Sequence, residues 1–464
     1  MLARIMGAGG TRNTKEGPRS KFFLPCCLFL TIWVLVGGWQ PSDIRVFAVL
    51  GLSGSALLMY VLAKDGLSAW HFLSIPARLL LIFFCLMPLL QLVPLPPGFW
   101  HILPGRELAR DTLSAAGDVR HWQPITLSFQ ATLRSFLIFV WLSTFLLALL
   151  QLSLQEMRHV FRLILGLGLL NVAVGVVQVV SGGSVLQFDD SVSPFLIGLF
   201  ANKNHTGLFL AIALLAGYVA IFGERGWNRS RTTSVLPLVL VLMVALFATL
   251  SRAGVVFGFM ALAFLIAISV SKWPGKRERY VIFVTALVAL CGLVAIAFTT
   301  VASRTVVRFG EIGDDLRWSI WQWSWPLAEK YFPVGGGIGS FTSLFPPDEK
   351  LGWVKPTIVN HVHNDYIEQI IEVGVAAPIF WLLIVVTIAS PLREAWAERM
   401  QPAGRMATIG AAILALIALH STIDYPLRRP AIAACAMVAV AALLGLNARK
   451  RRLRITAGYA RQAG

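Results

Sequence analysis

The chain of 464 residues is 57% hydrophobic and only 14% charged, and its mean hydropathy is +0.72. Because a soluble domain carries about 25% charged residues, this composition excludes an ordinary soluble protein and indicates an integral membrane protein. The net charge of +17 is spread over several short loops, so it indicates membrane orientation rather than a nucleic-acid-binding surface.

Apolar runs recur along almost the whole chain, and each is long enough to cross a hydrocarbon core of about 30 Å. Because the runs are continuous rather than alternating, they predict helices and not the strands of a membrane barrel. We therefore expect an all-α, polytopic fold with about twelve transmembrane helices. They are predicted over residues 22–38, 44–63, 77–94, 133–151, 160–180, 206–222, 234–250, 253–270, 280–300, 367–390, 406–423 and 430–447.

Charge asymmetry gives these predicted helices an orientation. Residues 1–21 are expected to form a basic cytoplasmic leader, residues 22–447 a single transmembrane domain and residues 448–464 a basic cytoplasmic tail. The first run is interpreted as a retained anchor, since a second run follows at once and no cleavage site stands between them. With the N-terminus inside, the inside segments hold 25 of the 40 Lys and Arg, as the positive-inside rule predicts. A large periplasmic loop over residues 301–366 then joins the ninth and tenth helices.

Two polar motifs lie at the outer ends of predicted helices. In AsnLysAsnHis (202–205), Asn204 is equally well interpreted as a helix cap or as a substrate contact. In SRAG (251–254), Arg252 stands between two apolar runs with no room for a loop. An arginine there is costly unless it snorkels to the surface or binds a counter-charge. We favour binding, and on the outer face the natural counter-charge is a phosphate or diphosphate.

Arg317 is a third candidate, in a stretch crowded by the four tryptophans of residues 318–325. Indole rings favour the headgroup level, so this stretch is predicted to lie along the outer interface. The alternative is a simple ion pair between Arg317 and Asp314 or Asp315. The glycines of residues 335–339 lack a following GK[ST] and a βα unit, which favours a hinge or a close backbone approach over a nucleotide loop.

The stretch HVHNDYIEQIIEVG (361–374) combines two histidines with three carboxylates. His363 is the best candidate for a general base, because its intrinsic pKa is near neutral. Asp365 and Glu368 have the spacing of a capping pair at a helix start. Glu368 and Glu372 share one helix face, and either is a candidate partner for a site arginine.

A metal site built on the two histidines, with His205 or His420 as a further ligand, is the weaker alternative. The spacing is not that of a typical zinc site and no outside cysteine is available. We therefore expect no metal. His420 and Asp424 are spaced i, i+4 on one helix face, where structural pairing and catalysis remain open.

Taken in order, ANKNHTG (201–207), SRAG, the segment from Arg317 to the glycines, HVHNDYIEQIIEVG and HSTIDYPLRRP (420–430) resemble the O-antigen ligase superfamily. This superfamily includes O-antigen ligases, Wzy-type polysaccharide polymerases and O-oligosaccharyltransferases. The resemblance covers about residues 90–430 and begins with LQLVPLPPGFW (90–100). The resemblance depends on the order of the motifs along the chain and not on any single motif.

The resemblance implies a multi-pass glycosyltransferase of the bacterial inner membrane whose active site faces the periplasm. Its donor would be an undecaprenyl-diphosphate-linked glycan, and its acceptor a hydroxyl of a glycan or of lipid A-core, without metal, cofactor or nucleic acid. Arg252 and Arg317 would hold the lipid diphosphate, and His363 would act on the acceptor. His361 also precedes Asn364, so the choice of base stays open; we prefer His363 because Asn364 follows it directly. Further expected substrate contacts are Asn202, Asn204, His205, His361, Asn364, Glu368, His420 and Asp424.

Two alternatives accompany this expectation. A Wzy-type polymerase would use the same chemistry with a second lipid-linked glycan as acceptor, and no motif separates it from a ligase. A flippase or transporter for lipid-linked glycans would instead place ionisable groups near the bilayer midplane and show internal repeats. The charges of this sequence cluster at the outer helix ends, which favours an enzyme. A single displacement would invert the anomeric centre.

Overall fold

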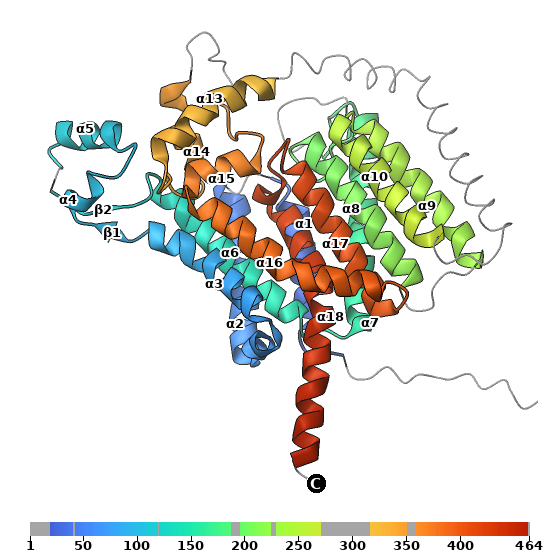
Figure 1. Cartoon of the computed structure of the whole chain (residues 1–464). Coiled ribbons are helices and arrows are strands. Elements are labelled where there is room, and N and C mark those ends of the chain that lie inside the picture. The colour runs from blue at the N-terminus through green and yellow to red at the C-terminus, as the bar shows by residue number, and fades with distance from the viewer. Residues whose placement is uncertain are drawn as a thin grey trace, which may run out of the picture.

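The computed structural model describes residues 19–39, 42–118, 120–186, 195–223, 229–270, 316–349 and 358–462. This part of the chain is almost entirely helical (Figure 1), as the apolar runs predict. The main bundle consists of α1 (Phe23–Val36), α2 (Ile44–Ala63), α3 (Ile75–Gln91), α6 (Phe129–Leu149), α7 (Leu154–Val180), α8 (Lys203–Phe222), α9 (Arg229–Ala248), α10 (Arg252–Val270), α16 (Ala376–Ala397), α17 (Pro402–His420) and α18 (Pro430–Gln462). A short 3-10 helix, η2 (Gly66–Phe72), joins α2 to α3.

Eight bundle helices in the described part are long and apolar enough to cross a membrane, namely α2, α6, α7, α8, α10, α16, α17 and α18. Shorter apolar helices are α1, α3 and the stretch Val235–Ala248 of α9. The prediction of a multi-pass helical membrane protein is therefore confirmed. The total of twelve stays a prediction, because the span expected at 280–300 lies outside the described residues.

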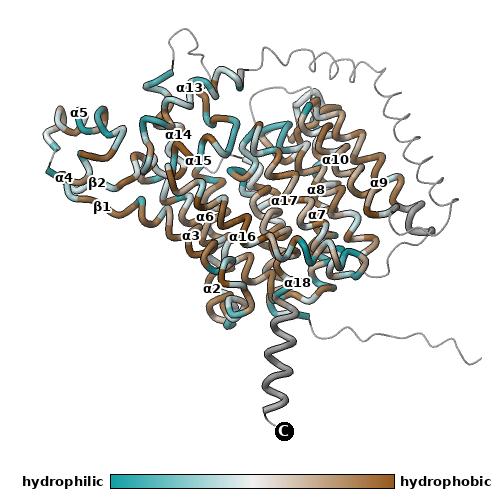
Figure 2. The backbone as a smooth tube through the Cα atoms, in the orientation of Figure 1, coloured by the Kyte–Doolittle hydropathy of each residue, from teal (hydrophilic) through white to brown (hydrophobic). Residues whose placement is uncertain are grey.

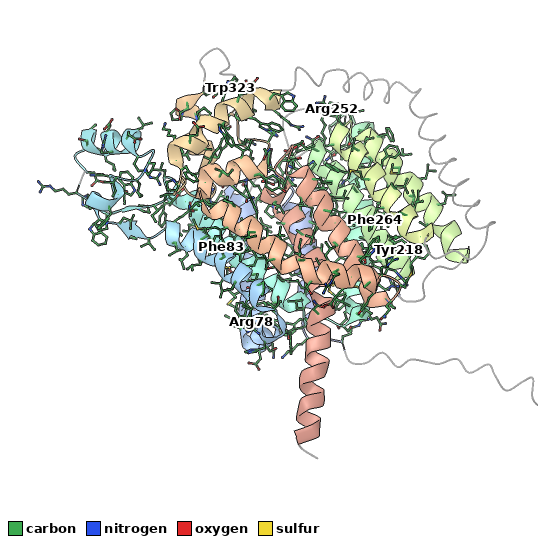
Figure 3. The ribbon with its side chains drawn as sticks, in the orientation of Figure 1. Arg78, Phe83, Tyr218, Arg252, Phe264 and Trp323 are labelled. Carbon is green, nitrogen blue, oxygen red and sulfur yellow. The ribbon has the colours of Figure 1, made fainter. Side chains whose placement is uncertain are left out.

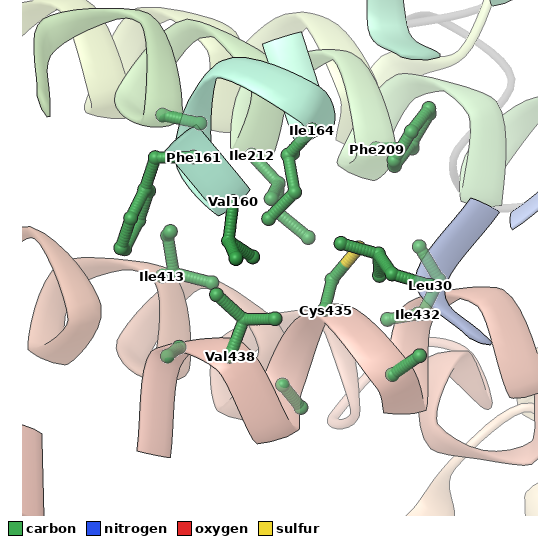
Figure 4. Packing of buried hydrophobic residues seen from close by; sticks show 14 of the residues in the cluster. Leu30, Val160, Phe161, Ile164, Phe209, Ile212, Ile413, Ile432, Cys435 and Val438 are labelled. Atoms are coloured by element: carbon green, nitrogen blue, oxygen red, sulfur yellow. The ribbon is translucent and has the colours of Figure 1, made fainter. Parts of the chain in front are cut away.

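Helix α8 forms the centre of the bundle, since apolar side chains surround it on all sides. Of its most apolar stretch, 94% is buried, and it packs against α7, α10 and α17. Small residues let α8 approach α10 closely: an ideal Cβ at Gly207 would lie 2.6 Å from Cα of Gly254. Figure 4 shows the core where these helices meet α1 and α18, with Leu30, Val160, Phe161, Ile164, Phe209, Ile212, Ile413, Ile432, Cys435 and Val438.

A second layer covers one end of the bundle (Figure 1). It consists of α13 (Leu316–Tyr331), α14 (Phe341–Leu344), η4 (Pro346–Asp348) and α15 (Asp365–Val373). The described part of the predicted loop 301–366 therefore contains helices, which share a hydrophobic cluster of Ile320, Leu327, Ala328, Tyr331, Phe341, Leu344, Phe345, Val362 and Ile371. Figure 2 shows this layer to be more hydrophilic than the bundle beneath it, as expected outside a membrane.

A small extension projects sideways beside this layer (Figure 1). It contains α4 (Pro97–Trp100), α5 (Glu107–Ala115) and the antiparallel pair of β1 (Pro94–Leu95) and β2 (Gln123–Pro124). Arg106, only 1% exposed, fastens it to the layer by donating from Nη2 to the carbonyls of Ile125 at 2.6 Å and Gly335 at 2.9 Å.

The glycine run approaches other backbones closely, which was one of its two predicted roles. The Gly336 and Gly337 N–H groups donate to the carbonyls of Ile371 and Glu372, each at 2.9 Å. Gly337 adopts φ +110°, a conformation that residues with a Cβ rarely take, and an added Cβ there would overlap Thr126. The run thereby packs against the C-terminal end of α15.

One predicted boundary is wrong. The span expected at 367–390 is divided into α15 and α16, because Gly374 takes φ +54° and the Val375 N–H donates to the carbonyl of Pro333 at 2.9 Å. The span expected at 430–447 agrees with the apolar stretch Pro430–Ala448, and α18 continues beyond it as a helix to Gln462, below the bundle (Figure 1). A continuous apolar run indicates neither feature. It does not show that a glycine within it has a positive φ, and it does not show whether a helix continues into the polar residues that follow.

Candidate active site

The start of α8 is capped by Asn202 and not by Asn204. The Asn202 side chain accepts the N–H of Asn204 at 2.8 Å, which satisfies one of the free donors at the helix start. The side chain of Asn204 is therefore available for tertiary contacts: its Oδ1 accepts from Ser251 Oγ at 2.8 Å and its Nδ2 donates to Asp424 Oδ2 at 2.8 Å. The capping interpretation of Asn204 is thus wrong.

The connection between α9 and α10 brings Arg252 to the same end of the molecule. Only residues 249–251 separate the two helices, as expected because the sequence leaves no room for a loop between the two apolar runs. Ser251 accepts the Gly254 N–H at 3.0 Å and, through Asn204, joins the start of α10 to the start of α8. Figure 3 shows Arg252 at the end of the bundle that carries Trp323 of α13, and Arg78 at the opposite end, so the two residues lie at opposite ends of the bundle as predicted; which end faces the periplasm stays a prediction.

Asp424 lies at the centre of the cluster, in the turn that follows α17. Its Oδ1 lies 3.1 Å from Nδ1 of His363 and accepts the N–H of Tyr425 at 3.0 Å. Its Oδ2 accepts from Asn204 and from Nη2 of Arg317, the latter at 3.3 Å. Arg317 therefore pairs with a distant carboxylate; Asp314 and Asp315, the partners considered from the sequence, lie outside the described residues.

The carboxyl group of Asp424 is fully buried. Burial alone raises the pKa of Asp424, but the hydrogen bond with His363 and the nearby imidazoles outweigh burial and hold this pKa well below its usual value. Asp424 is therefore an ionised acceptor at neutral pH. One carboxylate thus joins the candidate base to a candidate phosphate-binding arginine.

His363 reaches this position through an unusual backbone conformation. It takes φ +57°, in the left-handed region that non-glycine residues rarely enter. The next residue, Asn364, caps α15 by accepting the N–H groups of Tyr366 and Ile367 at 3.0 and 3.1 Å. The capping role predicted for Asp365 and Glu368 therefore belongs to Asn364.

His361 makes a second contact between a histidine and a carboxylate. Its Nδ1 lies 2.8 Å from Glu368 Oε1, while Glu368 Oε2 accepts the N–H of Val362 at 2.9 Å. Burial lowers the pKa of His361. Burial raises the pKa of Glu368, but Arg428 and His361 outweigh it, so that this pKa lies below its usual value. Both Glu368 and Glu372 do pair with an arginine, as predicted for one of them, but that arginine is Arg428.

The ring of Tyr425 packs against three of the site histidines. The distance between ring centroids is 4.0 Å to His361 and 4.9 Å to both His363 and His205. Tyr425 therefore separates the two histidine–carboxylate pairs and fixes their spacing.

His205 and His420 lie behind this surface, since each is 0% exposed. His420 is the last residue of α17, and the Asp424 N–H donates to its carbonyl at 2.9 Å. The His420 ring instead packs against Phe257 and His205, with centroid distances of 5.2 and 6.0 Å. Both rings therefore lie against protein groups, and their role as substrate contacts stays a prediction.

The structure brings together most of the residues that the sequence singled out. Asn204, Arg317 and His363 contact Asp424. His361 contacts Glu368, Asn364 donates to the carbonyl of Thr422, and the ring of Tyr425 packs between His361 and His363. Sequence reasoning missed Ser251, Tyr425 and Arg428. The signal for Arg428 was present, because carboxylates at 365, 368 and 372 share one helix face and require a cation when buried. In the described part of the chain, no group of three His, Cys, Asp or Glu is arranged to hold a metal ion.

Comparison with known proteins agrees with the motifs. A family model described as O-antigen ligase matches residues 237–382. No curated protein matches the chain. The matched range contains Arg252, Arg317, His361 and His363, whereas Asp424 and its turn follow it in the sequence. The predicted resemblance to the O-antigen ligase and Wzy superfamily is thereby confirmed over residues 237–382, which match the O-antigen ligase family model.

Proposed function

We propose that this protein transfers a glycan from undecaprenyl diphosphate to an acceptor hydroxyl on the periplasmic side of the bacterial inner membrane. The observation that supports this proposal best is the pair of contacts made by Asp424, 3.1 Å to His363 and 3.3 Å to Arg317. A base for the acceptor and a cation for the leaving group are thus held side by side.

The tautomer of His363 follows from its partner. An ionised carboxylate only accepts hydrogen bonds, so Nδ1 of His363 must carry the proton that faces Asp424. Nε2 then holds the free lone pair and is the atom that takes a proton from the acceptor hydroxyl. Asp424 also stabilises the imidazolium that forms, in the manner of the carboxylate in a Ser-His-Asp triad.

The chemistry is a single displacement. The acceptor oxygen forms a bond to the anomeric carbon while its proton moves to Nε2 of His363. The bond between the anomeric carbon and the diphosphate oxygen breaks, and the diphosphate leaves with the electron pair. Arg317 and Arg252 offset the negative charge on the leaving group through charge-assisted hydrogen bonds. The anomeric centre is inverted.

The environment of each histidine favours His363 over His361 as the base. His361 faces a carboxylate that Arg428 already neutralises, and burial lowers the pKa of His361, so its ring is a poor proton acceptor. The carboxylate that faces His363 is that of Asp424. Its other oxygen accepts hydrogen bonds from Arg317 and from Asn204 at the start of α8. The polar cluster also lies at helix ends rather than in mid-span, which supports a transferase over a flippase.

Reconstitution tests this function. Proteoliposomes that hold the purified chain are given an undecaprenyl-diphosphate-linked glycan and either lipid A-core or additional donor as acceptor. Transfer to lipid A-core supports a ligase, and chain growth on the donor supports a polymerase. Loss of transfer is expected in His363→Ala and not in His121→Ala, a control whose side chain is 78% exposed. No transfer to either acceptor would refute the proposed function.

A further inference from the structure

Arg428 binds three carboxylates that line one face of α15. It lies in the short 3-10 helix η6 (Pro426–Arg428), and its side chain is 17% exposed. Its Nη1 and Nη2 donate to the two carboxylate oxygens of Glu372 at 3.1 and 2.8 Å. Its Nε lies 3.0 Å from Glu368 Oε1 and 3.5 Å from Asp365 Oδ1.

One of these carboxylates controls the segment that leads to His363. Glu368 contacts His361 at 2.8 Å and the backbone N–H of Val362 at 2.9 Å. The chain then enters the left-handed conformation of His363, which costs free energy unless neighbouring contacts hold it. The contacts of Glu368 therefore fix the residue directly before the candidate base.

The turn that carries Arg428 also carries Asp424, and it is bonded to the start of α15. The Asp365 N–H donates to the Ser421 carbonyl at 2.9 Å, and Ser421 Oγ donates to Asp365 Oδ2 at 2.8 Å. Asn364 Nδ2 donates to the Thr422 carbonyl at 2.9 Å. Arg428 closes the other end of this contact, so residues 421–428 and α15 are held together on both sides of the pair His363–Asp424.

The charges in this contact do not balance without Arg428. Three buried carboxylates face one guanidinium; His361 contacts one of them, Glu368, and Arg429 acts electrostatically on His361. Burial raises the pKa of both Asp365 and Glu372 to about 7 even with the guanidinium present. Removal of one partner from a buried ion-pair cluster leaves uncompensated charge and is strongly destabilising locally.

We propose that Arg428 is a positioning residue for the transfer reaction: it holds α15 against the turn 421–428 and thereby keeps His363 in contact with Asp424. This inference rests on the proposed function. Arg428 acts through Glu368 and Glu372 and does not touch the substrate. Its loss should therefore lower kcat while leaving the KM for the lipid-linked donor nearly unchanged.

Kinetics in proteoliposomes distinguish a positioning role of Arg428 from a role in binding the donor. Arg428→Met is expected to lower kcat about 100-fold, the size of effect that a misplaced catalytic group produces. Arg428→Lys, which keeps the charge without the planar fork, should recover part of kcat. Arg45→Met is the matched control, since Arg45 lies at the start of α2 with a side chain 90% exposed. A rise in donor KM with unchanged kcat in Arg428→Met would overturn the inference.

A compensating change separates positioning from direct contact with the diphosphate. Adding Glu372→Gln to Arg428→Met removes one of the uncompensated carboxylates while leaving Glu368 and His361 in place. If Arg428 positions α15, the double variant is expected to regain roughly 10-fold in kcat over Arg428→Met, because effects within one ion-pair network are not additive. If Arg428 binds the leaving group itself, Glu372→Gln restores nothing, and that result would also overturn the inference.

The role of Arg428 is also tested by a measurement that does not require glycan transfer, so that it can fail independently of the proposed function. Carbethoxylation of His363 by diethyl pyrocarbonate is followed by mass spectrometry in the full chain, with exposed His121 as internal reference. In Arg428→Met, His363 is expected to be carbethoxylated several-fold faster than in wild type, while His121 reacts at the same rate in both proteins. Equal rates at His363 would refute positioning by Arg428 whether or not the protein transfers glycans. Absence of transfer in wild type would instead refute the proposed function alone.

Discussion

Nδ1 of His363 lies 3.1 Å from Oδ1 of Asp424, although 61 residues separate them in the chain. The contact joins the stretch before α15 to the turn after α17. Further hydrogen bonds hold both sides of this contact. Asp424 also accepts from Asn204 and Arg317, and Asn364, the residue after His363, donates to the carbonyl of Thr422. Four segments distant in the sequence therefore meet at one buried carboxylate.

Replacement of the central carboxylate is expected to cost activity more than stability. Asp424→Asn retains the shape of the side chain but offers Nδ1 of His363 no ionised acceptor. We expect kcat to fall on the order of 10²–10⁴-fold, as when a carboxylate that orients a catalytic histidine becomes an amide. The measurement is initial transfer rate in proteoliposomes. Asp348→Asn serves as control, because its side chain is 36% exposed and pairs with Lys330 away from the cluster; equal losses in both variants would contradict the role of Asp424.

The two histidines should differ in how their replacement affects the reaction. His363→Gln removes the proton acceptor, so kcat should drop about 10²–10⁴-fold at every pH. His361→Gln keeps a donor toward Glu368, and its kcat should remain within about 10-fold of wild type, since general-base catalysis is left intact. Parallel kcat measurements decide the assignment. A larger loss in His361→Gln than in His363→Gln would transfer the role of base to His361.

The close contact between α8 and α10 should be sensitive to a single methyl group. In Gly207→Ala the new Cβ would lie 2.6 Å from Cα of Gly254, so the two helices must move apart. We expect a loss of stability of about 1–3 kcal/mol, typical of overpacking, together with reduced transfer because Asn204 and Ser251 separate. Denaturation of the purified protein measures the first effect. Gly166→Ala in α7 is the matched control, since a Cβ added there would have no atom within 4 Å; similar losses in both variants would argue against this packing.

Glu372 should make stability depend on pH in a defined direction. Burial raises its pKa from 4.5 to about 7, so between these values the unfolded chain gives up its proton before the folded one does. Stability contributed by this group therefore falls as pH rises from about 4.5 to about 7 and is constant above that range. Glu372→Gln does not titrate, so its melting temperature minus that of wild type should increase from pH 5 to pH 7.5. A difference that stays constant or decreases would contradict the raised pKa.

Much of the fold could be predicted from the sequence, because continuous apolar runs are a local signal. The break between α15 and α16 could not, since Gly374 resembles any glycine in an apolar run. What divides the helix is the carbonyl of Pro333, which comes from another segment and accepts the N–H of Val375. The continuation of α18 as a polar helix was missed for a related reason: hydropathy does not distinguish a helical basic segment from an irregular one.

For the site, the sequence supplied the residue types and the structure supplied their partners. Arg317 and His363 were predicted to meet, and Asp424 is the group through which they do so. Arg428 went unnoticed because its partner Glu372 is 56 residues away and pairs with it only when the turn after α17 docks on α15. The three carboxylates on one face of α15 indicate that a cation is needed, but only the tertiary structure shows which cation pairs with them.

The proposed transfer reaction requires His363 and Asp424 to act as one unit. A double-mutant cycle measures this: kcat for glycan transfer is compared among wild type, His363→Gln, Asp424→Asn and the double variant in the same proteoliposomes. Because residues that act together lose their effect together, the double variant is expected to be no slower than His363→Gln alone. If the two losses instead multiply, so that the double variant is slower by the product of both factors, the two side chains work independently and the site proposed for this protein is wrong.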